Sequence, residues 1–274
     1  MDNVLGYEGK TVVVTGAASG MGEAAAKILV DVGANVIALD VKPTELAGVT
    51  SMIIDLRDKA SIDDVVSKID GPVQAVFSVA GLPGPPFSDL DTMTVNFVGA
   101  RHLVESLVPK MAPGGGIVCV ASNGGLGWQQ NLEAIMPLVN TPDFESGQAW
   151  VEANAETIAL ASAYAFSKQC TNAYVASRGT DLIAQGIRLN CTNPGPTTTA
   201  MMPYFEEQNG KDLIDAFIGP SGRRSLPEEQ AWPMVFLNSP HMTYVAGEAI
   251  HVDGGFLGAM VTGKLQVSFE VPES

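Results

Sequence analysis

The sequence predicts an α/β fold with a doubly wound parallel sheet, and three observations support this prediction. Short apolar runs rich in β-branched residues alternate with segments of helical periodicity along the chain. The strand-like runs are apolar almost throughout, which is typical of parallel strands that helices cover on both faces. A turn with three glycines joins the first strand-like run to the first helical segment, and such a turn lets the chain reverse sharply.

The expected elements follow one another in a regular order. Strands are predicted at residues 11–15, 35–40, 51–55, 74–79, 116–122, 187–193 and 249–252. Helices are predicted at residues 20–32, 59–69, 91–111, about 159–184 and 227–238. Because parallel strands are joined through such helices, right-handed crossovers are expected.

Two segments interrupt this alternation. Residues 123–158 separate a strand from the next long helix, which is far more than a usual connection, so we expect an insertion with structure of its own. Residues 194–222 are rich in Pro, Thr, Met and aromatic residues. We expect them to form a substrate loop, because loops at the carboxyl ends of parallel strands bind ligands. No repeat or linker divides the chain, so residues 1–274 are expected to form one domain.

Composition and charge exclude several classes of protein. No apolar run approaches the length of a membrane span, so we expect no membrane partner. The net charge of −15 offers no basic stripe, so nucleic acid is not an expected partner. Asp2 lies where a signal peptide would carry positive charge, which indicates a cytoplasmic protein. The cysteines and histidines show no ligand spacing, so no metal site is predicted.

The glycine turn reads TGAASGMGEA at residues 15–24 and contains Gly16, Gly20 and Gly22. Positions without Cβ allow a pyrophosphate to approach the backbone and the positive end of the following helix. A purely structural tight turn is the alternative for this motif alone. Asp40 ends the next strand, 20 residues beyond Gly20, where a carboxylate can bond ribose hydroxyls and repel a 2′-phosphate. We therefore predict a Rossmann-like site for NAD rather than NADP.

Tyr164 and Lys168 lie four residues apart in a predicted helix, in the segment AYAFSK, and share one face. An adjacent ammonium favours the phenolate, so we expect the pKa of Tyr164 to be lowered and the side chain to exchange a proton with an alcohol or carbonyl. An exposed helix pair is the alternative for these two residues alone. Ser122 at a strand end and Asn96 on a predicted helix can supply uncharged hydrogen bonds.

Together these motifs resemble the short-chain dehydrogenase/reductase family over nearly the whole chain. The matching segments are the TGxxxGxG turn, IIDL, VAG at 79–81, NPGPTTT at 193–199 and HVDGG at 251–255. The resemblance implies hydride transfer in which Tyr164 is the general acid/base and Lys168 lowers its pKa and holds the nicotinamide ribose. It also implies that Ser122 orients the substrate oxygen and that Asn96 anchors a proton-relay water.

The resemblance further implies a set of cofactor-binding residues, with Asp55 beside the adenine. The set is Gly16, Ser19, Gly20, Met21, Gly22, Asp40, Val41, Asp55, Leu56, Ala80, Gly81, Tyr164, Lys168, Pro194, Gly195, Thr197 and Thr199. The family often has Asn-Asn-Ala-Gly where this chain reads Ser78-Val79-Ala80-Gly81, so side-chain roles at the first two positions are not carried over.

The long insertion, GRRSLPEEQA and the VDGG tail resemble the branch that contains bacterial 3α-hydroxysteroid dehydrogenase/carbonyl reductase. In that branch the insertion is helical and alters the usual oligomer contact. The resemblance therefore implies a helical insertion between Ser122 and Tyr164 and a homo-oligomer, either a dimer or a tetramer.

The predicted substrate residues are mostly apolar and include adaptable methionines, which suits a bulky alicyclic or aromatic alcohol. Core packing is the alternative for each of them. We predict an NAD-dependent oxidoreductase that interconverts a secondary alcohol and a ketone, with hydroxysteroid-like compounds as the leading substrate class. Two alternatives remain open: a 3-oxoacyl carrier protein reductase and a catalytically silent NAD-binding regulatory protein. The substrate candidates are Asn123, Gly124, Trp128, Met201, Met202 and Phe205, with Leu126, Tyr204 and Phe217 as further pocket candidates.

Overall fold

Seven parallel strands form one sheet in the computed structural model, which describes residues 3–265. The strand order is β3-β2-β1-β4-β5-β6-β7. It reverses between β1 and β4, so connections run to opposite sides there and leave a crevice at the carboxyl ends of the strands. The doubly wound fold is confirmed. The strands are β1 (Thr11–Thr15), β2 (Asn35–Asp40), β3 (Val49–Ile53), β4 (Val73–Ser78), β5 (Met111–Val120), β6 (Arg188–Pro194) and β7 (Ala249–Val252).

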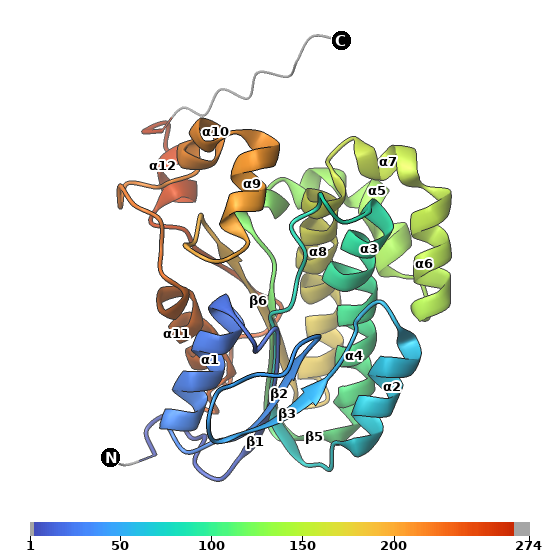
Figure 1. Cartoon of the computed structure of the whole chain (residues 1–274), viewed down its shortest axis with the longest axis vertical. Helices are drawn as coiled ribbons and strands as arrows, with labels where there is room; N and C mark the ends of the chain where they lie inside the picture. The colour runs from blue at the N-terminus through green and yellow to red at the C-terminus, as the bar shows by residue number, and fades with distance from the viewer. Residues whose placement is uncertain (1–2, 266–274) are drawn as a thin grey trace.

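Helices cover both faces of this sheet (Figure 1). Helices α1 (Gly20–Asp31) and α11 (Pro227–Asn238) pack on one face, and α2 (Lys59–Lys68), α4 (Gly99–Leu107) and α8 (Ala163–Ile183) on the other. Successive side chains of a strand point to opposite faces. In β1, Val12 and Val14 therefore join the core under α1 and α11, whereas Val13 joins the other core.

Several predicted boundaries are wrong. Strand β3 ends at Ile53 rather than at residue 55, and β5 begins at Met111 rather than at residue 116, because Met111 already pairs with Val73 of β4. The helix predicted at 91–111 is interrupted by a π-helical turn near its beginning. Its parts are α3 (Asp89–Met93), the π turn η1 (Thr94–Val98), α4 and the 3-10 turn η2 (Val108–Lys110).

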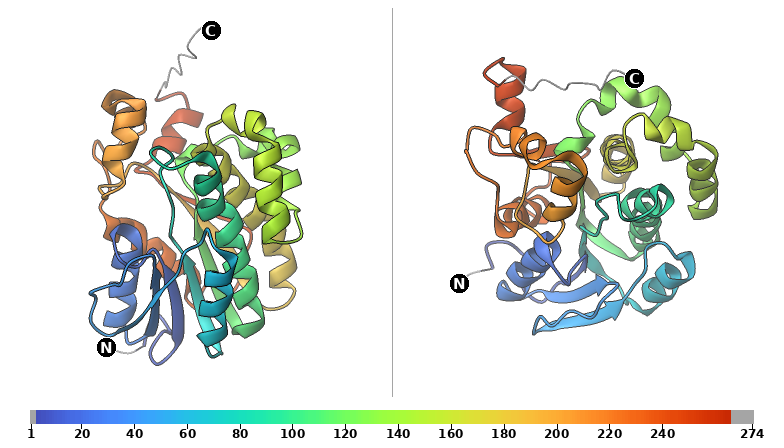
Figure 2. Two further views of the ribbon diagram at one scale, coloured as in Figure 1. Left: turned by 45° about the vertical axis from the view of Figure 1, so that its right-hand side comes forward. Right: turned by 45° about the horizontal axis from the view of Figure 1, so that its top comes forward.

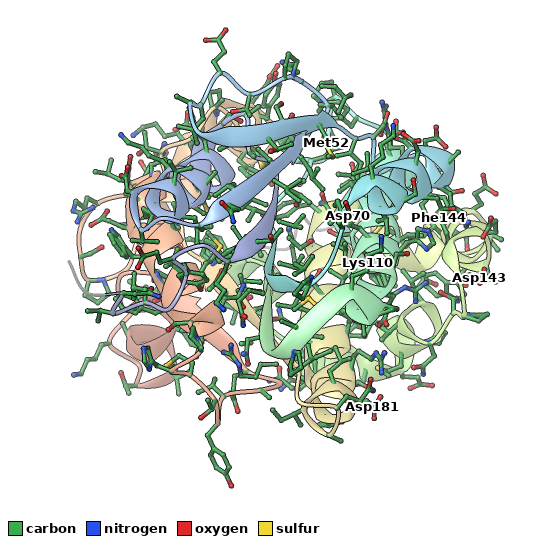
Figure 3. All side chains as sticks on the ribbon, turned by 90° about the horizontal axis from the view of Figure 1, so that it is seen from below. Met52, Asp70, Lys110, Asp143, Phe144 and Asp181 are labelled. Carbon is green, nitrogen blue, oxygen red and sulfur yellow. The ribbon has the colours of Figure 1, made fainter. Side chains whose placement is uncertain are left out.

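Figure 3 views the molecule from below, at the end of the sheet opposite the carboxyl ends of the strands, and Lys110 is labelled there. Its ammonium donates hydrogen bonds of 2.7 and 2.8 Å to the carbonyls of Val66 and Ile69, at the end of α2. A cation at a helix C-terminus satisfies carbonyls that have no partner within the helix. The end of α2 is thereby fixed to the start of β5, far from the carboxyl ends of the strands.

The insertion is helical, as predicted, and lies outside α8 (Figure 1). Arg101 on α4 is buried and connects it to the body of the domain. The guanidinium donates to the carbonyls of Leu138, Val139 and Asp143 at 3.2, 2.9 and 3.1 Å, and to the Thr141 hydroxyl at 2.8 Å. The insertion consists of the 3-10 turns η3 (Asn123–Gly125) and η4 (Trp128–Asn131) and helices α5 (Leu132–Val139), α6 (Phe144–Ala153) and α7 (Ala155–Ala159).

Two short helices, α9 (Met202–Asn209) and α10 (Lys211–Ala216), follow β6 and lie above the carboxyl ends of the strands (Figure 2). A further helix, α12 (Phe256–Val261), follows β7. None of these three helices is predicted from the sequence. No helix within residues 3–265 is both long enough and apolar enough to cross a membrane.

Candidate active site

The glycine turn lies at the carboxyl end of β1 and against the end of β4. Gly16 and Gly20 have φ angles of +67° and +59°, a region that favours glycine. A methyl group at Gly16 would come within 2.9 Å of the Ala80 Cα atom, so the two chain segments meet without room for a side chain. Thr15 reinforces this contact, because its hydroxyl accepts hydrogen bonds from the N–H groups of Val79 and Ala80.

The N-terminus of α1 follows directly, and no side chain caps it. The first N–H groups of a helix have no partner within it and carry partial positive charge. An uncapped helix start beside glycines is the arrangement that suits a pyrophosphate. Thr199 belongs to the same place, since a Cβ on Gly20 would lie 3.4 Å from the Thr199 methyl carbon. Predicted cofactor-binding residues from the turn after β1 and from the loop after β6 therefore lie close together.

Asp40 lies at the end of β2 beside this turn. Its carboxylate accepts hydrogen bonds from the N–H groups of Ala18 at 3.0 Å and Lys42 at 3.1 Å. A carboxylate has about four acceptor positions, so capacity for ribose hydroxyls is left. The neighbouring Val41 is exposed, which leaves an apolar surface next to the carboxylate.

Asp55 and Leu56 follow β3, and their surroundings differ. The Arg57 guanidinium binds both oxygens of Asp55, with its nearest nitrogen at 2.7 Å, and these hydrogen bonds hold the pKa of Asp55 below its usual range. The Leu56 side chain is buried in the core. If Leu56 contacts a cofactor, it does so through its backbone.

Tyr164 and Lys168 lie one turn apart at the start of α8, as the spacing predicts. The Lys168 ammonium is buried, lies 5.5 Å from the centre of the Tyr164 ring, and donates a 2.9 Å hydrogen bond to the carbonyl of Val120. Burial lowers the pKa of Lys168 to about 8, because an ammonium away from water loses its hydration.

The expected lowering of the Tyr164 pKa is wrong for the protein alone. Burial raises this pKa, and the Ser122 side chain opposes the shift without overcoming it. The physical reason is that removing a phenolate from water costs more free energy than a hydrogen bond from one neutral hydroxyl restores. In the protein alone, Tyr164 therefore carries its proton at neutral pH.

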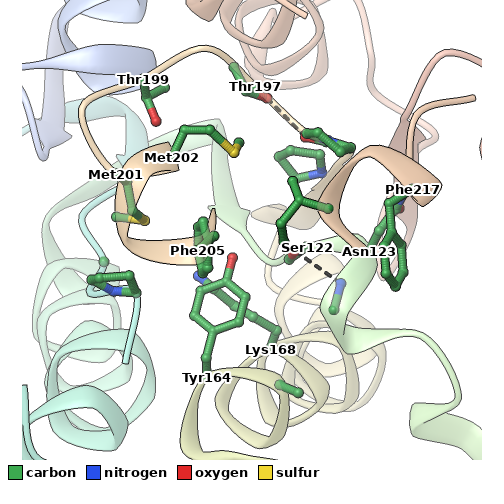
Figure 4. A pocket seen from close by; sticks show the side chains of 18 of the residues that line it. Ser122, Asn123, Tyr164, Lys168, Thr197, Thr199, Met201, Met202, Phe205 and Phe217 are labelled. Carbon is green, nitrogen blue, oxygen red and sulfur yellow. Dashed lines mark hydrogen bonds between the residues drawn. The ribbon is translucent and has the colours of Figure 1, made fainter. Parts of the chain in front are cut away.

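Ser122 lies immediately after β5 and faces Tyr164 (Figure 4). Its hydroxyl accepts a 3.0 Å hydrogen bond from the N–H of Gly124, and its own N–H donates to the Asn193 side chain at 3.2 Å. Asn193 lies near the end of the adjacent strand β6, and its side chain thus fixes the Ser122 backbone. Asn193 belongs to the NPGPTTT segment, but no role for its side chain is predicted from the sequence.

Asn96 lies in the π turn and is buried. Its side chain accepts from the N–H of Leu82 at 2.7 Å and donates to the Leu82 carbonyl at 3.0 Å and the Ser167 hydroxyl at 3.1 Å. A π turn inside a helix is rare and frequently marks a functional site. Here it presents Asn96 to the loop after β4, and a small cavity of about 20 Å³ borders Asn96. Such a volume holds about one water molecule.

A larger cavity of about 320 Å³ opens beside Tyr164. In Figure 4 the Tyr164 hydroxyl points into it, with Met201, Met202 and Phe205 near one wall and Phe217 at another. The Phe205 ring meets the Tyr164 ring edge-on, with 4.9 Å between ring centres. The predicted residues that line this cavity are Met21, Gly81, Ser122, Asn123, Gly124, Tyr164, Lys168, Pro194, Gly195, Thr197, Thr199, Met201, Met202, Phe205 and Phe217.

Trp128 does not line this cavity but packs against the core under α8. Leu126 and Tyr204 also lie outside the lining. The remaining predicted residues, apart from Asn96 and Trp128, lie along the glycine turn and the ends of β2, β3 and β4. Residues that line the cavity without having been predicted are Val79, Leu82, Pro83, Val120, Ala121, Ser162, Ala165, Pro196, Gln208, Asn209, Leu213 and Ile214. Most of these residues belong to no motif, because folding brings them together from several loops.

The glycine turn, the uncapped helix and the buried lysine beside a tyrosine define a class of protein. They fit an oxidoreductase that binds a nicotinamide dinucleotide along the carboxyl edge of the sheet. A family model described as short chain dehydrogenase matches residues 10–133, and one described as Enoyl-(Acyl carrier protein) reductase matches residues 151–257. The chain belongs to the short-chain dehydrogenase/reductase family. It is an oxidoreductase of a family whose cofactor is a nicotinamide dinucleotide.

Curated relatives and solved structures agree with this assignment. The chain is 28% identical to coniferyl-alcohol dehydrogenase of Pseudomonas sp. (strain HR199 / DSM 7063), over 92% of this chain and 98% of the relative. It is 29% identical to 3-alpha-hydroxysteroid dehydrogenase/carbonyl reductase of Comamonas testosteroni, over 91% and 97%. The structure of 3-alpha-hydroxysteroid dehydrogenase from Pseudomonas sp. B-0831 complexed with NADH covers 95% of this chain and all of its own, with 25% identity and a TM-score of 0.74.

Proposed function

We propose that this protein is an NAD-dependent dehydrogenase that interconverts an alcohol and a carbonyl compound, with secondary alcohols of bulky, uncharged molecules as the leading substrates. The observation that carries this proposal is the grouping of Tyr164, Ser122 and Lys168 beside one largely apolar cavity. A bound nicotinamide supplies the acceptor or donor of the hydride. The steps assigned to the chain are therefore proton transfer, orientation of the substrate oxygen and exclusion of water.

Tyr164 is the proposed general acid/base. Its raised pKa keeps the proton on the phenol, which suits donation to a carbonyl oxygen during reduction. In the oxidation direction the phenol must first lose its proton, and a charged Lys168 on the same side of the ring favours that loss. Ser122 donates a hydrogen bond to the substrate oxygen, and Asn96 holds the water through which the proton exchanges with solvent.

The substrate class is argued from the charge of the cavity wall. Among the described residues 3–265 that line it, Lys168 is the only one with a charged side chain. A carboxylate or phosphate group would have no partner other than this lysine, and an unpaired buried charge is costly. An uncharged alcohol such as a hydroxysteroid or an aryl alcohol fits better than a substrate carried on an acyl carrier protein. The names of the relatives, which include a coniferyl-alcohol and a hydroxysteroid dehydrogenase, support this class.

The preference for NAD rests on Asp40. Its carboxylate lies beside the glycine turn through its hydrogen bond to Ala18, where it would bond ribose hydroxyls and repel a 2′-phosphate. The roles of the other predicted cofactor residues belong to the same proposal. Three free, buried cysteines agree with the proposed cytoplasmic location.

A homo-oligomer is also part of the proposal. On α11, Trp232 and Phe236 are 41% and 50% exposed, and their ring centres lie 5.9 Å apart. Ile250 is exposed on β7, at the edge of the sheet. Exposed aromatic residues beside an open sheet edge are typical of a contact between subunits, and a measured molecular mass in solution equal to the monomer would rule the oligomer out.

The experiment that tests the function is a panel of steroids, terpenols and aryl alcohols with NAD. A ligand that binds the folded state raises its melting temperature by mass action. We expect at least one uncharged cyclic or aryl alcohol both to raise the melting temperature and to be oxidised with formation of NADH. Binding of NAD without turnover of any panel member would favour the regulatory alternative. Faster turnover with NADPH on acyl thioesters would favour the carrier protein reductase.

A further inference from the structure

Helices α9 and α10 form a cover on the substrate cavity, and their attachment to the rest of the domain is narrow. The two helices contribute Phe205 and Leu213 among other residues to the cavity wall. The two helices have eight and six residues and meet at Gly210. Gly210 has a φ of +78°, and no atom lies within 4 Å of the place where a Cβ would be. Helices shorter than about 12 residues are marginal on their own. Their mutual position must therefore come from side-chain contacts.

Arg224 supplies such a contact. Its guanidinium binds Glu206 of α9 at 2.7 Å and Asp215 of α10 at 2.6 Å, through the same terminal nitrogen. Within residues 3–265, Arg224 is the side chain that bonds to both helices. The side chain of Arg224 is 19% exposed, so water screens these pairs less than it screens surface pairs.

The backbone of Arg224 is anchored to the scaffold. The next residue, Ser225, donates its N–H to the carbonyl of Pro196 at 3.0 Å and accepts from the N–H of Thr198 at 2.9 Å. Its hydroxyl lies 2.9 Å from that of Thr197. These residues belong to the loop that follows β6 and borders the cavity. Arg224 therefore extends from a fixed loop to a cover made of two short helices.

The cover places an aromatic residue against the proposed acid/base. Phe205 precedes Glu206 on α9, and its ring meets that of Tyr164 with 4.9 Å between centres. A second attachment exists at the opposite side of α9, where Gln208 donates a 2.6 Å hydrogen bond to the carbonyl of Pro85. That hydrogen bond involves α9 alone, so it does not fix the angle between α9 and α10.

The neighbouring Arg223 offers a matched comparison. It pairs with Glu229 on α11 at 2.6 Å, and its side chain is 60% exposed. In the described part of the chain its guanidinium bonds to Glu229 and the Arg224 carbonyl and not to α9 or α10. Both arginines are thus in the same loop and each is paired with acidic side chains. Of these two arginines, Arg224 is the one whose ion pairs reach the cover.

We propose that Arg224 is a positioning residue that holds α9 and α10 together as one cover and thereby keeps Phe205 and the apolar wall in place for the substrate. The inference rests on the proposed function in one respect, because it takes this cavity as the substrate site. Loss of Arg224 loosens the cover, which weakens substrate binding and leaves the proton transfer at Tyr164 and the glycine turn unaffected.

The test compares Arg224→Met, Arg224→Lys and Arg223→Met with the unchanged protein. Hydrogen exchange of the backbone amides at residues 202–216 reports on the cover without any substrate. We expect faster exchange there in Arg224→Met, an intermediate rate in Arg224→Lys, which can keep one of the two ion pairs, and no change in Arg223→Met. With an alcohol substrate, we expect KM to rise about fivefold to tenfold in Arg224→Met. This is the fold-change that corresponds to the loss of two partly exposed ion pairs. We expect kcat and the affinity for NAD to stay within about twofold.

Two results would overturn the proposal. One is equal exchange at residues 202–216 in Arg224→Met and Arg223→Met, and the other is a lower kcat with unchanged KM. If Arg224→Met does not fold, Glu206→Gln removes the pair with α9 alone and is read in the same way. Asp215→Asn removes the pair with α10 together with the Lys211–Asp215 pair inside α10, so Lys211→Met is its control. If no alcohol or ketone is turned over, the proposed function fails, and the exchange comparison alone decides the role of Arg224.

Discussion

The ammonium group of Lys168 lies 5.5 Å from the centre of the Tyr164 ring, one helical turn further along α8. It faces the ring and the carbonyl of Val120 rather than open solvent. Burial shifts the two groups in opposite directions: it lowers the pKa of Lys168 to about 8 and raises the pKa of Tyr164. In the protein alone, the pair consists of a readily discharged amine and a protonated phenol.

A pH dependence follows from the Lys168 value. Its charged form favours proton transfer at Tyr164, and its pKa in the folded protein is lowered from 10.5 to about 8. The charge is therefore present below pH 8 and is lost as the pH rises through that value. We expect kcat/KM for ketone reduction to be level below about pH 8 and to fall above it. A profile that stays level to about pH 10, where an ordinary lysine titrates, would show that this amine is not needed in its charged form.

Cofactor choice is tested at Asp40. The change Asp40→Asn removes the negative charge but keeps an oxygen that can accept the hydrogen bond from Ala18. We expect the ratio of kcat/KM with NADP to that with NAD to rise by about tenfold, because one repulsion between like charges is removed. Asp31→Asn, at the exposed far end of α1, is the control and should leave the ratio unchanged. An unchanged ratio in Asp40→Asn as well would remove the basis for the NAD preference.

Stability of the insertion is tested at Arg101. The change Arg101→Met removes the buried guanidinium that donates to the carbonyls of Leu138 and Val139. The Leu138 carbonyl keeps the N–H and hydroxyl of Thr141 as donors, whereas the Val139 carbonyl loses its side-chain donor. We expect the free energy of unfolding, measured with denaturant, to fall by about 3 kcal/mol. Arg178→Met breaks an ion pair with Glu105 whose side chains are 28% and 34% exposed, and it should cost less than about 1 kcal/mol. Equal losses in the two variants would mean that Arg101 does not fix the insertion.

The sequence predicts the sheet because its signals are local. Each strand is an apolar run of β-branched residues, and the glycines at positions 16 and 20 adopt the positive φ angles that only a few residues tolerate. Tyr164 and Lys168 were found for the same reason, since four residues in a helix bring two side chains to one face. The signal and the geometry coincide wherever neighbours in sequence are neighbours in space.

Other features depend on distant contacts and could not be predicted in this way. Helices α9 and α10 are too short for a clear periodic pattern, and their position depends on Arg224, which lies beyond both in the chain. The π turn at Asn96 looks like ordinary helix in sequence. Trp128 was expected in the pocket because it is large and apolar, but those properties equally suit the core, where it packs. The raised pKa of Tyr164 reflects burial, which no spacing reveals.

The central claim is that the Tyr164 hydroxyl transfers the proton, and Tyr164→Phe tests it most directly. Phenylalanine keeps the ring contacts with Phe205 and the position above Lys168, and it removes only the hydroxyl group. The measurement is the rate of NADH oxidation with a ketone substrate in a single turnover, together with the dissociation constant of NADH. We predict a rate about a thousandfold lower with nearly unchanged NADH affinity. A rate within about twofold of the unchanged protein would contradict the account, because the proton would then come from another group.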